Sequence, residues 1–164
     1  MAIHTLKTVQ KIPASLKDTW DFFSKPANLD AITPRNMNFR VLTDPVADKI
    51  FPGQIIEYKV SPVFRIPIYW MTEIIAVDKE KYFVDEQRKG PYTLWRHEHY
   101  FKETDSGIEM TDLVQYKIPL GFIGEMVNAV FVKKQLSKIF EYRYQKVTEI
   151  FGKVAGQTCS VEIR

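Results

Sequence analysis

The sequence predicts an α+β fold in which a curved antiparallel sheet of about seven strands packs against one long C-terminal helix. Turn signals divide residues 39–118 into strand-length segments at intervals of roughly 8–14 residues, a spacing typical of a meander rather than of β–α–β units. Residues 121–151 instead repeat apolar side chains at about 100° per residue, the period of a helix. The length of 164 residues suits one domain.

One strand and two short helices precede the meander. Residues 3–12 alternate weakly and contain Thr and Val, as strands do. Ser15 precedes Asp18 by three positions, close to the pattern of a capping box, so we expect a short helix over residues 15–24. A second short helix is expected over residues 26–32, and the Thr-Pro pair that follows ends it because the residue before proline avoids the α region.

The other elements follow from alternation and from the apolar stripe. The long helix begins near Gly121 or Gly124 and ends near Gly152. Residues 153–164 show no periodicity and are expected to be a tail, so a single domain covers residues 1–152. The expected strands contain or span Phe39 and Val41, Ile56 to Val60, 65–78, 81–89, 93–103 and 108–118. The inward stripe of the helix is expected to hold Phe122, Met126, Ala129, Leu136, Phe140, Tyr144, Val147 and Phe151.

Composition excludes several classes of protein. The 23 basic and 20 acidic residues are mixed along the chain, so we expect no nucleic-acid partner, which would need a clustered basic face. The single cysteine, Cys159, excludes an intrachain disulfide and favours a reducing cytoplasm. No signal-like apolar segment opens the chain, and no run approaches the ~20 apolar residues of a membrane span. Aromatic residues make up 13% of the chain, enough to line an apolar pocket.

The order of the elements resembles the helix-grip fold of the Bet v 1-like, START and polyketide-cyclase superfamily over residues 1–152. The likeness is closest to a bacterial, SRPBCC ligand-binding branch, in a stretch that reads Gly90-Pro91, Trp95-x-His97-x-His99-x-Phe101 and Asp112-x-Val114-x-Tyr116-x-x-Pro119. The resemblance implies a cavity between the sheet and the C-terminal helix that holds an apolar ligand.

Polar residues interrupt the apolar faces of three elements. Side chains alternate along a strand, so Asp112 shares its face with Met110 and Tyr116, and His97 and His99 share theirs with Trp95 and Phe101. Arg143 falls on the inward stripe of the helix. A buried unpaired charge is costly, so these four polar residues should pair with one another. They form a structural hydrogen-bond network, a patch that orients a ligand, or both.

The turn at Thr104–Gly107 sets the register of the last hairpin. A loop of two or four residues pairs Thr104 with Gly107 or sets the equivalent register, and this register places His99 opposite Asp112. Opposite side chains have Cβ atoms ~4.5–5.5 Å apart, within reach of a hydrogen bond. The preceding turn leaves two registers open for Asp85 and Gln87. A three-residue turn puts Asp85 opposite His97, whereas a turn of two or four residues pairs Val84 with His97 and leaves Asp85 on the outer face beside Arg96.

The sequence therefore predicts a binder of a small apolar or amphipathic ligand, such as a lipid, a polyketide or an aromatic compound. The first alternative is a cyclase or dehydratase that uses His97, His99 and Asp112 for acid–base catalysis, since no nucleophile motif is present. The second is a protein-interaction module. The cavity is expected to be lined by Tyr58, Trp95, His97, His99, Phe101, Met110, Asp112, Tyr116, Phe140, Arg143 and Tyr144.

The same residues also have the chemistry of metal ligands. Imidazole and carboxylate ligands suit Zn²⁺ or Fe²⁺, and His97, His99 and Asp112 offer both. Against this, the only other histidine is His4, and proteins of the resembled superfamily generally bind no metal. We expect no metal and no other cofactor.

Overall fold

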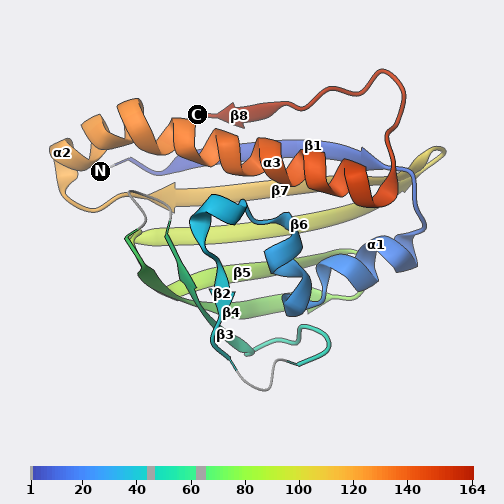
Figure 1. The fold of residues 1–164 in the computed structure, drawn as a ribbon, viewed down its shortest axis with the longest axis horizontal. Helices are drawn as coiled ribbons and strands as arrows, with labels where there is room; N and C mark the ends of the chain where they lie inside the picture. Colours follow the sequence, from blue (N-terminus) through green and yellow to red (C-terminus); the bar gives the residue numbers. More distant parts are fainter. Residues whose placement is uncertain (1, 44–46, 62–65) are drawn as a thin grey trace.

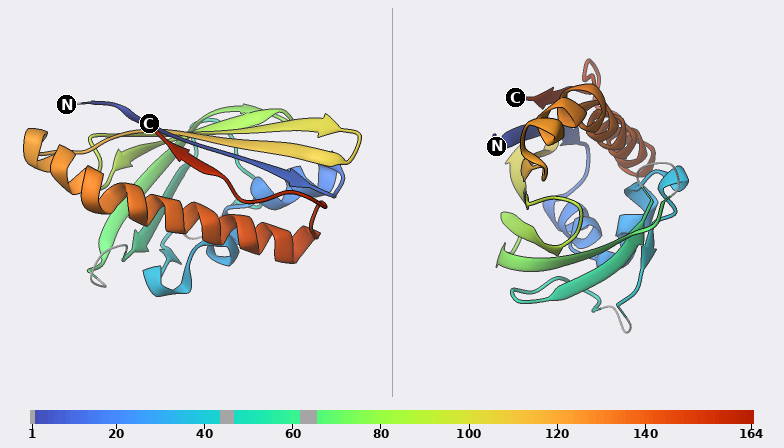
Figure 2. Two further views of the ribbon diagram at one scale, coloured as in Figure 1. Left: turned by 90° about the horizontal axis from the view of Figure 1, so that it is seen from above. Right: turned by 90° about the vertical axis from the view of Figure 1, so that its left-hand side faces the viewer.

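The computed structural model describes residues 2–43, 47–61 and 66–164 (Figure 1). Within these ranges, one antiparallel sheet of eight strands has the order β2-β3-β4-β5-β6-β7-β1-β8. Figure 2 shows the sheet curving toward the long C-terminal helix, so the predicted helix-grip architecture is confirmed. The strands are β1 (His4–Ile12), β2 (Arg40–Val41), β3 (Ile55–Val60), β4 (Ile68–Asp78), β5 (Tyr82–Lys89), β6 (Leu94–Thr104), β7 (Gly107–Lys117) and β8 (Val161–Ile163).

The connection from β1 to β2 contains the two predicted short helices. Helix α1 (Leu16–Phe23) begins after Ser15, whose Oγ accepts a hydrogen bond from the backbone N–H of Asp18 at 3.0 Å. The 3₁₀ helices η1 (Pro26–Ile32) and η2 (Arg35–Met37) follow. Trp20 of α1 is 3% exposed and packs edge-on against Phe101, so this segment closes one end of the curved sheet.

The hairpin of β6 and β7 has the predicted register. Thr104 pairs with Gly107 across a two-residue loop, and His99 lies opposite Asp112. Gly107 has φ of +120°, and a Cβ built on it would lie 2.2 Å from the carbonyl oxygen of Ile12. The turn therefore needs glycine for its backbone conformation and for the space beside β1.

The register of β5 and β6 resolves the two alternatives for Asp85. Asp85 lies opposite His97, on the inner face of the sheet. The side chain of Gln87 instead bonds to the connection between β5 and β6. Its Nε2 donates to the carbonyl oxygen of Tyr92 at 2.6 Å, and its Oε1 accepts from the N–H of Tyr92 at 3.3 Å.

The C-terminal helical segment is continuous but changes its winding. Helix α2 (Gly121–Val127) passes through the π-helical turn η3 (Asn128–Val132) into α3 (Lys133–Phe151). The predicted stripe is correct for Leu136, Phe140 and Val147, which are buried, and wrong for Phe122, Met126 and Ala129, which are exposed. The wider turns of a π-helix rotate α2 relative to α3, so one stripe cannot run through both.

The segment 153–164, expected to be a tail, returns to the sheet. Its strand β8 pairs with β1, placing Ile163 opposite Leu6, and accounts for the eighth strand. Three residues are too few to show a strand period in the sequence. In the described part of the chain, none of the helices has the length and apolar character that crossing a membrane would require.

Candidate functional site

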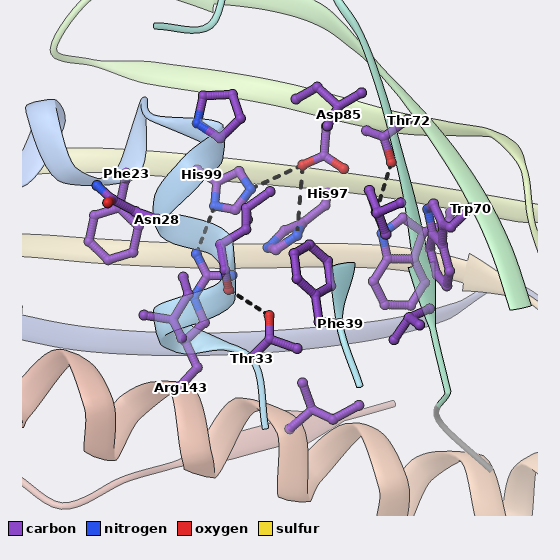
Figure 3. Close-up of a pocket in the computed structure, with 18 of the residues that line it drawn as sticks. Phe23, Asn28, Thr33, Phe39, Trp70, Thr72, Asp85, His97, His99 and Arg143 are labelled. Atoms are coloured by element: carbon purple, nitrogen blue, oxygen red, sulfur yellow. Dashed lines mark hydrogen bonds and ion pairs between the residues drawn. The ribbon is translucent and has the colours of Figure 1, made fainter. Parts of the chain in front are cut away.

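A cavity of about 220 Å³ lies between the inner face of the sheet, η1 and α3 (Figure 3). Strands β3 to β6 form its floor. Side chains alternate between the two faces of a strand, so alternate residues along these strands point into the cavity. Helix α3 and the segment from η1 to Phe39 form the opposite walls. The sheet contributes Ile56, Tyr58, Val60, Trp70, Thr72, Ile74, Phe83, Asp85, Trp95, His97 and His99.

Aromatic rings form one end of the cavity. Trp70 stacks on Tyr58 with ring centroids 5.9 Å apart, and it meets Trp95 edge-on at 5.3 Å. Tyr92 lies 4.8 Å from Trp95, and Phe39 lies 5.1 Å from Tyr58. Edge-on and offset contacts are the favoured geometries of aromatic pairs, so this wall is both apolar and rigid.

Charged and imidazole side chains gather at the other end (Figure 3). One oxygen of Asp112 lies 2.8 Å from His99 Nδ1, 3.1 Å from His97 Nε2 and 3.5 Å from Arg143 Nη2. The second carboxylate, Asp85, lies 3.1 Å from His99 Nε2 and 3.9 Å from His97 Nδ1. The two imidazole rings, 3.8 Å apart, therefore lie between two carboxylates, and Arg143 approaches from α3. We call these five residues the polar cluster.

Burial determines the charge state within the polar cluster. Desolvation, reinforced by the neighbouring His99, lowers the pKa of His97 from 6.5 to about 4, so His97 is neutral near pH 7. Burial alone would raise the pKa of Asp112. The guanidinium of Arg143 and hydrogen bonds from both imidazoles outweigh this effect and hold the Asp112 pKa well below its usual value. Asp112 is therefore a buried anion with donors on His97, His99 and Arg143, and its second oxygen accepts from the Thr8 hydroxyl at 3.4 Å.

The structure brings six of the predicted lining residues to the cavity wall: Tyr58, Trp95, His97, His99, Phe140 and Arg143. Asp112 is in the polar cluster, but it lies behind the two histidines and does not line the cavity.

The prediction is wrong for Phe101, Met110, Tyr116 and Tyr144. Phe101 and Met110 pack in a separate core beside α1, because α1 fills that end of the curved sheet. Tyr116 is fully buried elsewhere and donates its hydroxyl to Asn128 Oδ1 at 3.1 Å. Tyr144 lies on the flank of α3 that faces β1, where its carbonyl accepts from Gln10.

Sequence reasoning missed Trp70 and the wall formed by η1, and it left the position of Asp85 open. Trp70, Thr72 and Ile74 alternate along β4 and point into the cavity, and Trp70 lies opposite Tyr58, whose inward position was predicted. Apolar residues occur at both alternating sets of positions in this strand, so the sequence did not show which set faces inward. Asp85 depended on a turn geometry that the sequence left open. The residues of η1 had no strand or helix period from which an inward face could be assigned.

Solved structures share this architecture at low sequence identity. The protein Ms6760 from Mycobacterium smegmatis matches with a TM-score of 0.62 and 18% identity, over 89% of this chain and 92% of that one. The ginseng major latex-like protein 151 from Panax ginseng matches with a TM-score of 0.66 and 13% identity, over 91% and 97% of the two chains. Ara h 8.0201 matches with a TM-score of 0.60 and 14% identity, over 90% and 99%.

No protein-family model matches the chain, and no curated protein matches it. The comparisons therefore concern shape, and at these identities they establish the fold alone. The chain has the helix-grip fold of Bet v 1-like proteins.

Proposed function

We propose that the chain binds one small apolar or amphipathic ligand in the cavity between the sheet and α3. The observation that carries this proposal is the cavity itself, with an aromatic wall at one end and the polar cluster at the other. A mainly apolar pocket with a few convergent polar groups is the usual form of a small-molecule site. Residues 1–152 contribute all the side chains that line it.

The volume favours a compact ligand. An apolar cavity of ~150 Å³ accommodates benzene, whereas pockets for drug-sized ligands occupy ~300–1,000 Å³. A cavity of about 220 Å³ lies between these cases. We therefore favour an aromatic compound or a short polyketide over a long acyl chain enclosed along its whole length.

The polar atoms of the wall favour a ligand with a hydrogen-bond acceptor. Trp70 is 8% exposed, and its Nε1 has no hydrogen-bond partner among the described residues. Leaving a buried donor unpaired costs ~1–3 kcal/mol. A ligand oxygen that accepts from this N–H would recover that energy, although the nitrogen itself is closed off, so the neighbouring rings would have to shift to admit it.

Native mass spectrometry of protein purified from its own host tests the proposal directly, because a retained small molecule gives a defined mass increment. Binding of 2-naphthol, followed by ligand-detected NMR, provides a test with a known compound. Ile139→Trp places a larger side chain in the cavity and is expected to weaken 2-naphthol binding at least tenfold.

Ile150→Trp is the matched control, because Ile150 lies on the same helix, is 46% exposed and does not line the cavity. It should bind 2-naphthol as the wild type does. Equal binding by both variants, or no retained ligand and no 2-naphthol binding by the wild type, would contradict the proposal.

A cyclase or dehydratase is the second candidate. It is favoured by the two imidazoles, which face the cavity while Asp112 supports them from behind. A carboxylate that orients an imidazole suits proton transfer next to a carbonyl. Mass spectrometry coupled to chromatography separates the functions. A dehydratase lowers the mass of its ligand by one water on incubation, a cyclase keeps the mass but changes the retention time, and a binder changes neither.

The remaining parts of the proposal concern location and partners. We propose that the protein acts in the cytoplasm and without nucleic acid, on the grounds of its single Cys159 and its mixed charges.

A further inference from the structure

Three side chains of the polar cluster converge on one point at the cavity wall. Asp85, His97 and His99 each offer a ligand atom, and these atoms lie within 4.8 Å of one another. Donor atoms bound to one Zn²⁺ at ~2.0–2.2 Å lie at most about 4.2 Å apart, so small side-chain rotations bring the three atoms to binding distance. All three residues line the cavity, which leaves the remaining coordination positions open to a ligand or water.

Asp112 orients both imidazoles for this role. Asp112 accepts a hydrogen bond from His97 Nε2 at 3.1 Å, so His97 Nδ1 presents its lone pair toward Asp85. His99 lies 2.8 Å from Asp112 through Nδ1, and its Nε2 forms a hydrogen bond with Asp85 at 3.1 Å. A metal ion bound at this point would replace the hydrogen between His99 Nε2 and Asp85. A carboxylate that holds the far nitrogen of a ligating histidine is the usual second layer of a protein metal site.

The charges of the cluster favour a cation at the same point. Arg143 pairs with Asp112, and among the described residues no lysine or arginine pairs with Asp85. The Asp85 side chain is only 15% exposed, and its oxygen lies 3.1 Å from His99 Nε2, with which it forms a hydrogen bond. A divalent cation bound between these atoms would compensate the buried carboxylate more fully than that hydrogen bond does.

We propose that Asp85, His97 and His99 bind a divalent first-row transition-metal ion, such as Zn²⁺. Two histidines and one carboxylate with open positions form a common protein site for Zn²⁺ or Fe²⁺. This inference reverses the expectation of a metal-free protein, and the reason is Asp85, whose place on the inner face the sequence did not determine. The site stands independently of the proposed ligand, since metal binding is measurable without it.

The test is calorimetric titration of the chelator-treated full chain with ZnCl₂, together with the visible absorption spectrum after addition of Co²⁺. We expect one tightly bound ion per chain and the absorption bands of a low-coordinate Co²⁺. Asp85→Asn keeps the size of the side chain but removes its charge, and it should weaken Zn²⁺ binding at least 100-fold. Asp48→Asn, at a carboxylate whose side chain is 81% exposed, is the control and should bind like the wild type.

No binding by the wild type, or equal binding by the wild type and Asp85→Asn, would overturn the proposal. Such a result would show that a hydrogen, rather than a metal ion, lies between His99 Nε2 and Asp85. If Asp85→Asn does not fold, the Co²⁺ spectrum of the wild type decides the question alone. Binding of 2-naphthol in the presence of chelator shows separately whether the ligand proposal holds.

A second, independent observation concerns α2. An ordinary surface helix buries its apolar side, but α2 and the π-helical turn η3 expose theirs. The buried residues here are Gly124 of α2 and the polar Asn128 of η3. Figures 1 and 2 show α2 at the end of the molecule, projecting past the strands. We call the following residues the α2 apolar face: Leu120, Phe122, Ile123, Met126, Val127, Val130 and Phe131, which are 38–79% exposed.

The charges around the α2 apolar face are positive. Residues 117–134 contain three lysines and one acidic residue, Glu125, which His4 Nε2 already contacts at 2.8 Å. A symmetric dimer through this face would bring the lysines of two copies together, whereas an anionic surface would neutralise them. An apolar helical face beside lysines matches the helices that lie in the interface of a bilayer.

We propose that the α2 apolar face docks onto the surface of an anionic lipid bilayer. Sedimentation of the full chain with phosphatidylcholine vesicles, with and without phosphatidylglycerol, tests this. We expect binding that depends on phosphatidylglycerol, and at least a tenfold loss for the double variant Phe122→Ser/Val130→Ser. Ile150→Ser, at an exposed position outside the α2 apolar face, should bind normally.

Both substituted side chains are 79% exposed, so the double variant should fold as the wild type does. No vesicle binding by the wild type, or equal binding by the double variant, would overturn the proposal. A dimer in solution that the double variant converts to a monomer would also overturn it and assign the face to a second copy of the chain.

Discussion

Asp112 concentrates the contacts of the polar cluster on one oxygen atom. Oδ1 lies within 3.5 Å of donors on His97, His99 and Arg143, and Asp112 itself is 6% exposed. Arg143 forms its ion pair from α3, so Asp112 also joins the helix to the sheet. Removing one partner of a buried ion pair is costly because the other charge remains buried without compensation.

Asp112→Ala is therefore expected to destabilise the fold by ~3–5 kcal/mol, because it leaves Arg143 without a carboxylate. Asp112→Asn should cost less, since the amide oxygen still accepts hydrogen bonds. The free energy of unfolding from urea titrations measures both changes. Asp78→Ala, at a carboxylate that is 43% exposed, serves as the control and should stay within ~0.5 kcal/mol of the wild type. An Asp112→Ala midpoint equal to that of the wild type would contradict the role of the ion pair.

At the scale of elements, the segments that close the ends of the sheet depend on a few specific contacts. Asp21 of α1 accepts from Lys17 at 2.8 Å within the helix and from Lys49 at 2.6 Å in the segment before β3. These hydrogen bonds lower the pKa of Asp21 from 3.8 to about 2. The contact therefore joins α1 to a segment about thirty residues away as long as Asp21 is ionised.

The stability contributed by Asp21 should depend on pH with a defined sign. Because the pKa is lower in the folded state, the contribution is complete above pH 3.8 and is lost as the pH falls toward 2. Asp21→Asn should melt at a lower temperature than the wild type at pH 7, and the difference should shrink at acidic pH. Thermal melts over a pH series measure this, with Asp30→Asn as the exposed control. A difference that does not depend on pH would rule out the ion pairs as its source.

The turn between β6 and β7 permits a steric prediction. Gly107→Ala would place a Cβ 2.2 Å from the Ile12 carbonyl oxygen, at a φ of +120°. Gly53 also has a positive φ, +86°, but no neighbouring atom within 4 Å, so Gly53→Ala reports the conformational cost alone. We expect Gly107→Ala to lose more than about 1 kcal/mol beyond Gly53→Ala in chemical denaturation. Equal losses would show that β1 moves aside freely.

At the scale of the whole molecule, the C-terminus completes the sheet. Strand β8 covers the outer edge of β1, where Leu6 is fully buried and packs with Val161 and Ile163. An uncovered edge strand exposes backbone groups that pair readily with other chains. The last residues of the chain thus protect a strand at its beginning.

A chain that ends at Gly156 should lose stability and associate. It lacks the two half-buried side chains of β8, together worth on the order of 2–3 kcal/mol, and leaves the β1 edge open. Urea titration measures the loss, and light scattering after size-exclusion chromatography measures association. An unchanged midpoint and a monomeric profile would show that β8 contributes only a surface contact.

The sequence by itself determined the elements and the main register. Alternation, turn residues and the capping pattern at Ser15 depend on neighbours along the chain, and they predicted the strands, the short helices and the pairing of His99 with Asp112. Four of the five residues of the polar cluster were predicted from the sequence, because each is a polar residue on the apolar face of a strand or on the apolar stripe of the helix. These are His97, His99, Asp112 and Arg143.

Only the tertiary structure decided the boundary of the cavity and the place of Asp85 in the polar cluster. Phe101 and Met110 carry the same parity as lining residues, yet α1 packs on them, and parity does not record which element covers a strand. The position of Asp85 depended on the backbone path of one turn. The apolar side of α2 faces outward because the π-helical turn η3 rotates α2 relative to α3. Such features result from contacts between distant segments, whose geometry no local pattern contains.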